Sequence, residues 1–426
     1  MAESLQKIQR FVVLMLENRS FDHLFGYLKD INPKVEGLTN QQFSNFVDPR
    51  KPQGPQVYAS DIAGPKMPFD PPHEFFDVQT QLYGPDVTGL HPNPPVPDAP
   101  MNGFLFCGNA TADHAVPDAT GKGHCVMECF APGQVPFITT LAQQFAIFNF
   151  WYSSLPGPTW PNRFFVHAAT SGGLSDSPGT EAIVAGYSFK NGTIYDSLAK
   201  AGKDWRIYHD GLPQTAGIDS LRLAYIDPFT RHFREYSNFK QDVKDQILPE
   251  YTFIEPRYGG FFDTDFVKGN SMHPKDDVTE GDKLVREVYE TLRNSDYWQD
   301  TMLIITFDEH GGFYDHVSPP PAEPTGDDAS YANKVNNFNF DRYGVRVPAI
   351  VISAYTASGT IIGTDPKDES TMFDHTSILA TVAKRFKLPP LTARDQAANT
   401  LEVAIDLDTP RVDAPTDLLS PTPTAP

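Results

Sequence analysis

The sequence predicts an α/β fold built on a mostly parallel β-sheet, with helices on both faces and inserted loops. Several short apolar runs stop abruptly at polar residues, which is typical of strands buried in a parallel sheet. Segments with helical periodicity lie between these runs, and strands that alternate with helices favour such a sheet. A proline-dense stretch near residues 60–100 fits neither kind of element and indicates an ordered insertion over the sheet edge.

Five apolar runs are the predicted strands. The two clearest are FVVLML at residues 11–16 and MLIITF at residues 302–307, and both end directly before acidic residues. The run VPAIVIS at residues 347–353 predicts a third parallel strand. YTFIEP at residues 251–256 and WRIYH at residues 205–209 have the same character and complete the set.

Helices are predicted between the strands. The clearest spans residues 278–293, where Val285, Val288 and Leu292 recur at helical spacing. A second helix is expected from Pro161, because proline suits the first turn of a helix and NRFFVHAAT follows it.

The chain of 426 residues is expected to form one compact domain over residues 1–410, followed by a flexible tail at 411–426. A hydrophobic content of 40% and an aromatic content of 12% suffice for a large core. Three cysteines cannot all pair with one another, which argues against a disulfide-built fold. The segment HCVMEC at residues 124–129 has zinc-like spacing but lacks a second pair of ligands.

The net charge is −20, with a pI near 4.9. A nucleic-acid partner is not expected, because no basic run offers contacts to phosphates. The charge also disfavours anionic lipid, so at most transient contact with a neutral or zwitterionic membrane surface is expected. No stretch predicts a transmembrane helix, and the run at 11–16 is too short for a signal core. We therefore expect a cytoplasmic protein, or an exported one whose leader is absent from this sequence.

Two pairs of polar residues follow the two clearest strands: Glu17–Asn18 and Asp308–Glu309. Ligands of open α/β sheets bind beyond the carboxyl ends of the strands, where these side chains would emerge. Three carboxylates and one amide oxygen suit one divalent cation, which could be Ca, Mg, Mn or Zn. The alternative for each pair is a solvated loop or a helix cap.

Thr159 lies just ahead of the helix expected at Pro161. A helix N-terminus favours an anion, and a hydroxyl there can attack phosphorus when a metal lowers its pKa. Thr159 would then also complete the metal ligand set. The alternative is that Thr159 only caps the helix.

Histidines form the third group of candidates. His73 and His273 lie in irregular, proline-marked loops, and His209 ends a predicted strand. Each could steady phosphoryl oxygens or protonate a leaving group, and the alternative for each is an exposed loop side chain. His375 is expected to help start a helix.

Seven longer motifs occur in series: LENRSFDHLFGYL, DPPHEF, PGPTWPNRFFVHAATSGG, HPKDDVTEGDKLV, FDEHGGFYDHVSPP, YGVRVPAIVISAY and FDHTSIL. In this order they resemble the phosphoesterase family, from about residue 8 to about residue 390. That family includes non-specific phospholipases C and a group of acid phosphatases. It looks like a member of the alkaline-phosphatase-like superfamily, so the resemblance implies a three-layer α/β/α sandwich.

The resemblance also implies roles for individual residues. The family's metal ligands correspond to four residues: Glu17, Asn18, Asp308 and Glu309. Thr159 corresponds to the nucleophile, which is Ser or Thr in relatives. His73 and His273 match histidines that the family places near the transferred phosphate, and His209 falls in a less distinctive stretch.

These expectations describe a metal-dependent phosphoester hydrolase that acts through a phosphothreonine intermediate. The favoured substrate is a phosphatidylcholine-type lipid, cleaved to diacylglycerol and the phosphorylated headgroup, and the alternative is an acid phosphatase acting on monoesters. Trp151, Tyr152 and Trp160 could hold a choline by cation–π contact, although core packing is the alternative. A non-catalytic, metal-stabilised binding protein is the remaining possibility, and the intact ligand set argues against it.

Overall fold

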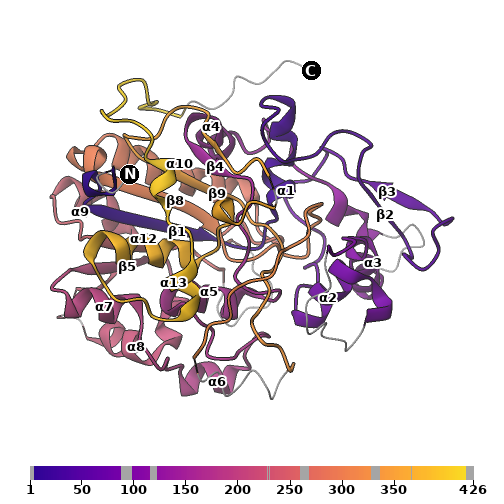
Figure 1. The fold of residues 1–426 in the computed structure, drawn as a ribbon, viewed down its shortest axis with the longest axis horizontal. Helices are drawn as coiled ribbons and strands as arrows, with labels where there is room; N and C mark the ends of the chain where they lie inside the picture. The colour runs from indigo at the N-terminus through magenta and orange to yellow at the C-terminus, as the bar shows by residue number, and fades with distance from the viewer. Residues whose placement is uncertain are drawn as a thin grey trace.

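The computed structural model describes the following residues: 4–87, 98–115, 122–227, 229, 231–259, 268–327, 336–365 and 367–418. The strands of the central sheet are β1 (Arg10–Leu16), β4 (Ala146–Phe148), β5 (Trp205–His209), β6 (Phe233–Glu235), β7 (Tyr251–Glu255), β8 (Thr301–Phe307), β9 (Ala349–Ile352) and β10 (Ile361–Ile362). Their order is β10-β4-β9-β8-β1-β7-β5-β6, with β1 near the middle (Figure 1). A separate antiparallel pair consists of β2 (Ser44–Phe46) and β3 (Gln56–Tyr58).

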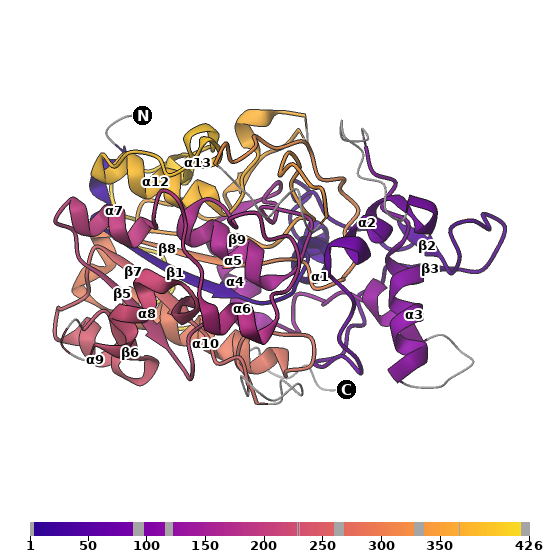
Figure 2. The ribbon, with the colours of Figure 1, turned by 90° about the horizontal axis from the view of Figure 1, so that it is seen from below.

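Helices cover both faces of the sheet. They are α1 (Phe21–Phe25), α2 (Phe75–Tyr83), α3 (Phe104–Ala115), α4 (Pro136–Gln144), α5 (Thr159–Ala168), α6 (Thr180–Ala185), α7 (Ile194–Lys200), α8 (Asp219–Ile226), α9 (Phe239–Lys244), α10 (Val278–Arg293), α12 (Thr376–Phe386) and α13 (Ala393–Ala397). Figure 2 shows α12 and α13 above the strands and α9 and α10 below them. The predicted α/β class is confirmed. Among the described helices, none combines the length and hydropathy that a bilayer crossing requires.

Most sheet neighbours are parallel, but β9 is not. β1 pairs in parallel with β7 and β8, and β5 pairs in parallel with β6 and β7. β9 runs antiparallel to both β8 and β4. The strand predicted at 347–353 is present, but the prediction that it is parallel was wrong. The described parts of the connection from β8 to β9 are loop, and β9 therefore starts near the edge where β8 ends. A buried apolar run looks the same in either direction, which is why the sequence did not reveal this.

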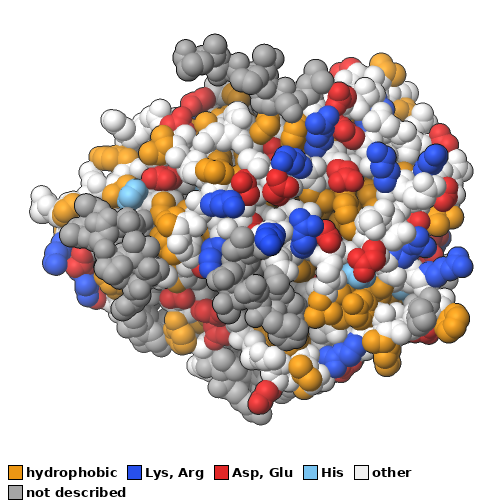
Figure 3. Space-filling view, turned by 180° about the vertical axis from the view of Figure 1, so that it is seen from behind, with side chains coloured by type: hydrophobic (Ala, Val, Ile, Leu, Met, Phe, Trp, Pro, Cys, Tyr) orange, Lys and Arg blue, Asp and Glu red, His pale blue; other side chains and the backbone are white. Residues whose placement is uncertain are grey.

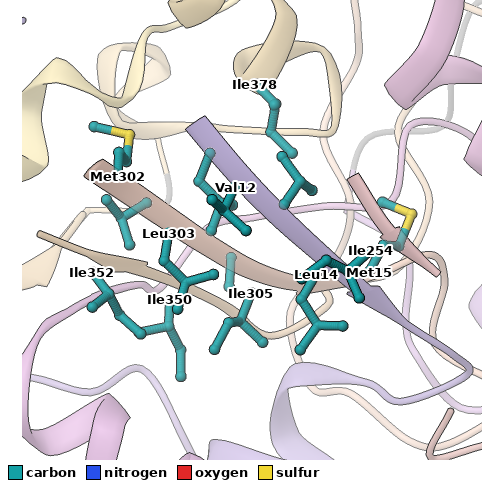
Figure 4. Close-up of a cluster of buried hydrophobic side chains, with 14 of the residues drawn as sticks. Val12, Leu14, Met15, Ile254, Met302, Leu303, Ile305, Ile350, Ile352 and Ile378 are labelled. Carbon is teal, nitrogen blue, oxygen red and sulfur yellow. The ribbon is translucent and has the colours of Figure 1, made fainter. Parts of the chain in front are cut away.

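The other predicted elements agree closely with the structure. The predicted strands at 11–16, 302–307, 251–256 and 205–209 correspond to β1, β8, β7 and β5, and the helix predicted over 278–293 is α10. Their side chains meet in the core shown in Figure 4: Val12 and Leu14 of β1, Leu303 and Ile305 of β8, Ile350 and Ile352 of β9, Ile254 of β7, and Ile378 of α12.

The residues between β1 and β4 form much of a lobe beside the sheet (Figures 1 and 2). α2, α3 and β3 contribute to a separate apolar cluster whose members include Tyr27, Val57, Val78, Leu82 and Phe104. α2 lies within the insertion predicted at 60–100 and begins with a capping box of Glu74 and Asp77. The prolines flank this helix, and residues 88–97 of the second proline-rich stretch lie outside the described residues.

The C-terminal stretch packs on α10 as far as the structure describes it. The Tyr289 hydroxyl donates to the Pro415 carbonyl oxygen over 2.6 Å, and Arg286 pairs with Asp417 at 2.8 Å. Leu418 is buried. Residues 411–418 are therefore docked on the core, although their composition predicts a flexible end, and the rest of the tail lies outside the described residues.

Candidate active site

The strand register brings the two predicted ligand pairs to one edge of the sheet. Leu16 pairs with Phe307, so Glu17 and Asp308 leave the sheet side by side. The Asn18 backbone amide donates to Asp308 Oδ1 over 3.0 Å and joins the two loops. Both acidic side chains are buried, which excludes the alternative of a solvated loop.

Two glycines allow the loop after Glu309 to pack closely against its neighbours. Gly311 has φ +64° and Gly312 has φ +74°, in the left-handed region that glycine adopts without strain. A Cβ atom would lie 2.3 Å from the Asn18 carbonyl oxygen at Gly311, and 2.7 Å from the Pro72 carbonyl oxygen at Gly312. The turn therefore requires glycine at both positions and holds the acidic loop close to the residues before His73.

His73 adjoins the acidic group. Its Nε2 lies 3.8 Å from Glu309 Oε1 and 3.2 Å from Asn18 Nδ2, and its Nδ1 donates to the Pro71 carbonyl oxygen over 2.7 Å. Burial alone would lower the pKa of His73, but the carboxylates of Glu309 and Asp70 outweigh burial and raise this pKa to about 9. His73 therefore retains a proton at neutral pH.

Three buried oxygens of this group have no hydrogen-bond partner among the described residues: Glu17 Oε2, Asn18 Oδ1 and Glu309 Oε1. Burial raises the pKa of Glu17 to about 7 and that of Glu309 to about 8. Unpartnered buried oxygens are costly unless a donor or a cation meets them. The oxygen-rich set and its missing partners fit a divalent metal ion.

Arg163 is a member of the site that no sequence pattern indicated. Its Nε lies 3.0 Å from Asp308 Oδ2, and its Nη2 lies 3.9 Å from Glu17 Oε1. The guanidinium also donates to the Tyr258 hydroxyl over 2.8 Å, and that hydroxyl donates to Glu255 over 2.9 Å. This buried chain fixes one positive charge between two of the three carboxylates.

Thr159 is the first residue of α5, and Pro158 occupies the N-cap position with φ −78° and ψ −175°. The alternative in which Thr159 caps the helix is therefore not realised. Thr159 precedes Arg163 by one turn, so the two side chains share a face of α5. Because Arg163 reaches Asp308 from that face, we expect the Thr159 hydroxyl to lie near the acidic edge of the sheet.

His273 belongs to a loop that is tied to the same edge. The Glu17 amide donates to the Ser271 carbonyl oxygen over 2.8 Å. Arg19 donates to the carbonyl oxygens of Met272 and His273. These contacts place the His273 loop directly beside Glu17.

His209 stands farther along the edge. It ends β5, and β7 separates this strand from β1. Its Nδ1 donates to the Gly211 carbonyl oxygen over 2.7 Å, and its ring contacts Tyr225 and Phe233. Within the described part of the chain, no hydrogen bond or ion pair joins His209 to the acidic group, and its catalytic role stays a prediction.

His375 stands at the N-cap position of α12, as expected, and it also supports the acidic loop. Its Nε2 donates to the Asp308 carbonyl oxygen over 2.7 Å. Its Nδ1 accepts from Trp151 Nε1 at 3.5 Å. Trp151 and Tyr152 are buried in the core, whereas Trp160 is partly exposed.

A second buried group, Asp22, Asp315 and His316, is the one set of three or more acidic, histidine or cysteine residues in the described chain whose ligand atoms all lie within 4.8 Å. Arg346 already donates to both carboxylates, over 3.0 Å to Asp22 and 2.9 Å to Asp315. His316 Nδ1 lies 2.6 Å from Asp22. Since a guanidinium occupies the position that a cation would take, this group does not fit a metal.

Solved structures with a similar backbone include the lipoteichoic acid synthase LtaP from Listeria monocytogenes. The match has 11% identity and a TM-score of 0.39, and it covers 64% of this chain and 70% of the synthase. A protein of the alkaline phosphatase superfamily from Vibrio parahaemolyticus has 16% identity and a TM-score of 0.33, with coverage of 61% and 63%. Scores this low carry no inference about function.

Sequence relatives are much closer. Non-specific phospholipase C3 of Arabidopsis thaliana is 38% identical over 422 residues, which cover 97% of this chain and 76% of the relative. Non-specific phospholipase C6 of the same plant is 40% identical over 417 residues, covering 96% and 75%. Phospholipase C A of Mycobacterium tuberculosis is 27% identical over 447 residues, covering 95% and 78%. The model of the Phosphoesterase family matches residues 8–389. This chain therefore belongs to the phosphoesterase family and is a phosphoric ester hydrolase.

Proposed function

We propose that this chain is a metal-dependent phospholipase C. It cleaves a phosphatidylcholine-type lipid into diacylglycerol and the phosphorylated headgroup. The names of its relatives support the lipid substrate. The proposed metal site is supported by three buried oxygens at the edge of the sheet that have no hydrogen-bond partner among the described residues.

The metal ion would be held by five side chains: Glu17, Asn18, Thr159, Asp308 and Glu309. When bound, a divalent cation lowers the pKa of a nearby hydroxyl and offsets the charge of the phosphoryl group. The purely oxygen ligand set suits Ca, Mg or Mn better than Zn. The Arg163 guanidinium keeps Asp308 oriented toward the same space.

The chemistry then proceeds on residues of the chain. The Thr159 hydroxyl gives up its proton to solvent, its oxygen attacks phosphorus, and the bond from phosphorus to the glycerol oxygen breaks. His73 keeps a proton at neutral pH, and it gives that proton to the departing alcohol. Water then attacks the phosphothreonine diester and gives a proton to His73, which releases the phosphorylated headgroup, and the Thr159 oxygen takes up a proton from solvent. His273 and the N-terminus of α5 steady the anionic oxygens.

Replacing the nucleophile tests this assignment. Thr159→Ala should lower kcat by at least about a thousandfold, because the attacking oxygen is removed. Thr159→Ser, which keeps a hydroxyl, should retain much of the activity. Thr279→Ala is the matched control, since Thr279 is also a partly buried threonine in the first turn of a helix. Substantial activity in Thr159→Ala would exclude Thr159 as the nucleophile.

Trapping of the phosphothreonine intermediate and a comparison of two substrates test the rest of the proposal. Acid quenching during turnover should leave the phosphorylated headgroup on the peptide that contains Thr159, as seen by mass spectrometry. Phosphocholine should be released from phosphatidylcholine faster than phosphate from p-nitrophenyl phosphate. The reverse preference would support the acid phosphatase alternative. Metal binding without hydrolysis of either compound would support a binding protein.

A further inference from the structure

Four large apolar side chains are exposed on α6, α8 and the turn after α8. The exposed fractions are 69% for Val184, 68% for Leu223, 67% for Ile226 and 91% for Phe229. Leu223 and Ile226 are three residues apart and share one face of α8. We call these four residues the apolar α6–α8 surface. Clustered exposed side chains of this size mark an interaction site more often than single ones do.

α6 has no buried residue, although its sequence is TEAIVA. It is held through its backbone, because Arg222 of α8 donates to the carbonyl oxygens of Val184 over 2.8 Å and Ile183 over 3.0 Å. These bonds keep α6 beside α8, at the lower side of Figure 1 and facing the viewer in Figure 2. Of the apolar side chains of α6, Val184 is therefore exposed and available to a partner, whereas Ile183 is half-buried.

The surface continues to the proposed nucleophile. Trp160 follows Thr159, and its ring lies over Gly217, where an added Cβ would be 2.9 Å from the ring. The Ile183 side chain lies 4.0 Å from the same point. One partly exposed tryptophan thus links the first turn of α5, where Thr159 lies, to α6.

The charges indicate an uncharged or zwitterionic partner. Arg222, the cation between the two helices, is engaged by carbonyl oxygens and lies 3.9 Å from Asp219. Glu181 is exposed on α6, and the whole chain carries −20. On the face seen in Figure 3, basic side chains are interspersed with acidic ones. Anionic lipid would be repelled, whereas burial of apolar side chains in a zwitterionic interface would be favourable.

We infer that the apolar α6–α8 surface inserts into the surface of a zwitterionic phospholipid bilayer and so presents the edge with Thr159 to the headgroups. This inference rests on the proposed phospholipase C function for the identity of the partner. It adds an interfacial binding site that is separate from the residues that perform the chemistry.

The test compares one triple variant with two single controls. The variant is Leu223→Ser/Ile226→Ser/Phe229→Ser, and the controls are Val412→Ser and Ile62→Ser, where the apolar side chains are also exposed, by 94% and 65%, but lie on other segments. Cosedimentation with phosphatidylcholine vesicles should show at least a tenfold weaker affinity for the triple variant alone. Hydrolysis of vesicle lipid should fall in parallel. Hydrolysis of a short-chain phosphatidylcholine below its micelle concentration should change less than about twofold, because the loss is one of apolar burial at the bilayer.

Each other outcome counts against one proposal. Equal vesicle binding by the triple variant and the original chain would overturn the inference, as would equal losses in the controls. A dimer that only the triple variant dissociates, seen by light scattering, would assign the surface to a second copy of the chain and overturn it. If the chain hydrolyses monomeric lipid but does not sediment with vesicles, the docking surface alone is refuted. If it binds vesicles through this surface but hydrolyses no lipid, the phospholipase C proposal is refuted instead.

Discussion

Glu17 and Asp308 lie on the same two loops that carry Asp22 and Asp315 a few residues later, yet the two buried acidic groups are balanced differently. In the group with Asp22, Arg346 bonds both carboxylates, and His316 and backbone amides meet the remaining oxygens. In the group with Glu17, three oxygens have no partner among the described residues.

The pKa of Asp22 follows this difference, although burial raises the pKa of its neighbour Asp315 to about 6. Burial would raise the pKa of Asp22, but His316 and Arg346 outweigh it and hold that pKa below its usual value. Burial raises the pKa of Glu17 to about 7 and that of Glu309 to about 8. Proximity of ligand atoms alone would select the Asp22 group as the metal site. Counting the charges and hydrogen bonds selects the Glu17 group instead, because its three carboxylates share the Arg163 guanidinium and still leave three buried oxygens without a hydrogen-bond partner among the described residues.

The largest expected effect concerns the balanced group. Arg346→Met leaves two carboxylates buried without their guanidinium, and we expect the free energy of unfolding to fall by about 3–5 kcal/mol. Arg50→Met is the control, because Arg50 pairs with Asp48 at the surface and its loss should leave the free energy of unfolding almost unchanged. Urea denaturation measures both. A loss below about 1 kcal/mol for Arg346→Met would show that the pairing of Arg346 with the two carboxylates does not stabilise the fold.

Metal binding at the group with Glu17 should stabilise the folded protein. After treatment with a chelator, Ca, Mg or Mn at a hundred times its Kd should raise the free energy of unfolding by about 2.7 kcal/mol. Glu309→Gln should abolish this increase, whereas Asp315→Asn should keep it relative to its own metal-free form. Thermal denaturation with metal titration measures the shift. The opposite pattern would place the ion at the Asp22 group and reverse the comparison.

The smallest expected effect is the pH dependence of metal affinity. Glu17 and Glu309 bind a cation as carboxylates, and their raised pKa values of about 7 and about 8 mean that protons compete for them below pH 8. Affinity should therefore fall by about tenfold, about 1.4 kcal/mol, between pH 8 and pH 7. Calorimetry in buffers of different ionisation enthalpy should also detect proton release on binding. An affinity that is constant over this range would contradict the unbalanced charge.

Much of the fold was readable from the sequence because buried strands and amphipathic helices leave strong local patterns. The apolar run at 302–307 predicts β8, and the spacing of Val285 and Leu292 predicts α10. The direction of β9 was not readable, since burial on both faces gives the same run of residues in either orientation. Direction depends on the path of the connecting loop, which has no such pattern.

The candidate site was predicted in part for the same reason. Polar residues at strand ends mark a ligand edge, so Glu17 and Asp308 could be singled out. Arg163 could not, because its partner Asp308 is 145 residues away and an arginine in a helix is usually a surface residue. The balancing of Asp22 by Arg346 was equally hidden, since it joins residues 324 positions apart.

The glycine turn at 311–312 has a consequence for anyone who alters this protein. A side chain at Gly311 would collide with Asn18, and one at Gly312 with Pro72, so either would separate the acidic loop from a segment far away in the sequence. A saturation library across this loop should lose nearly every clone with a bulkier residue there.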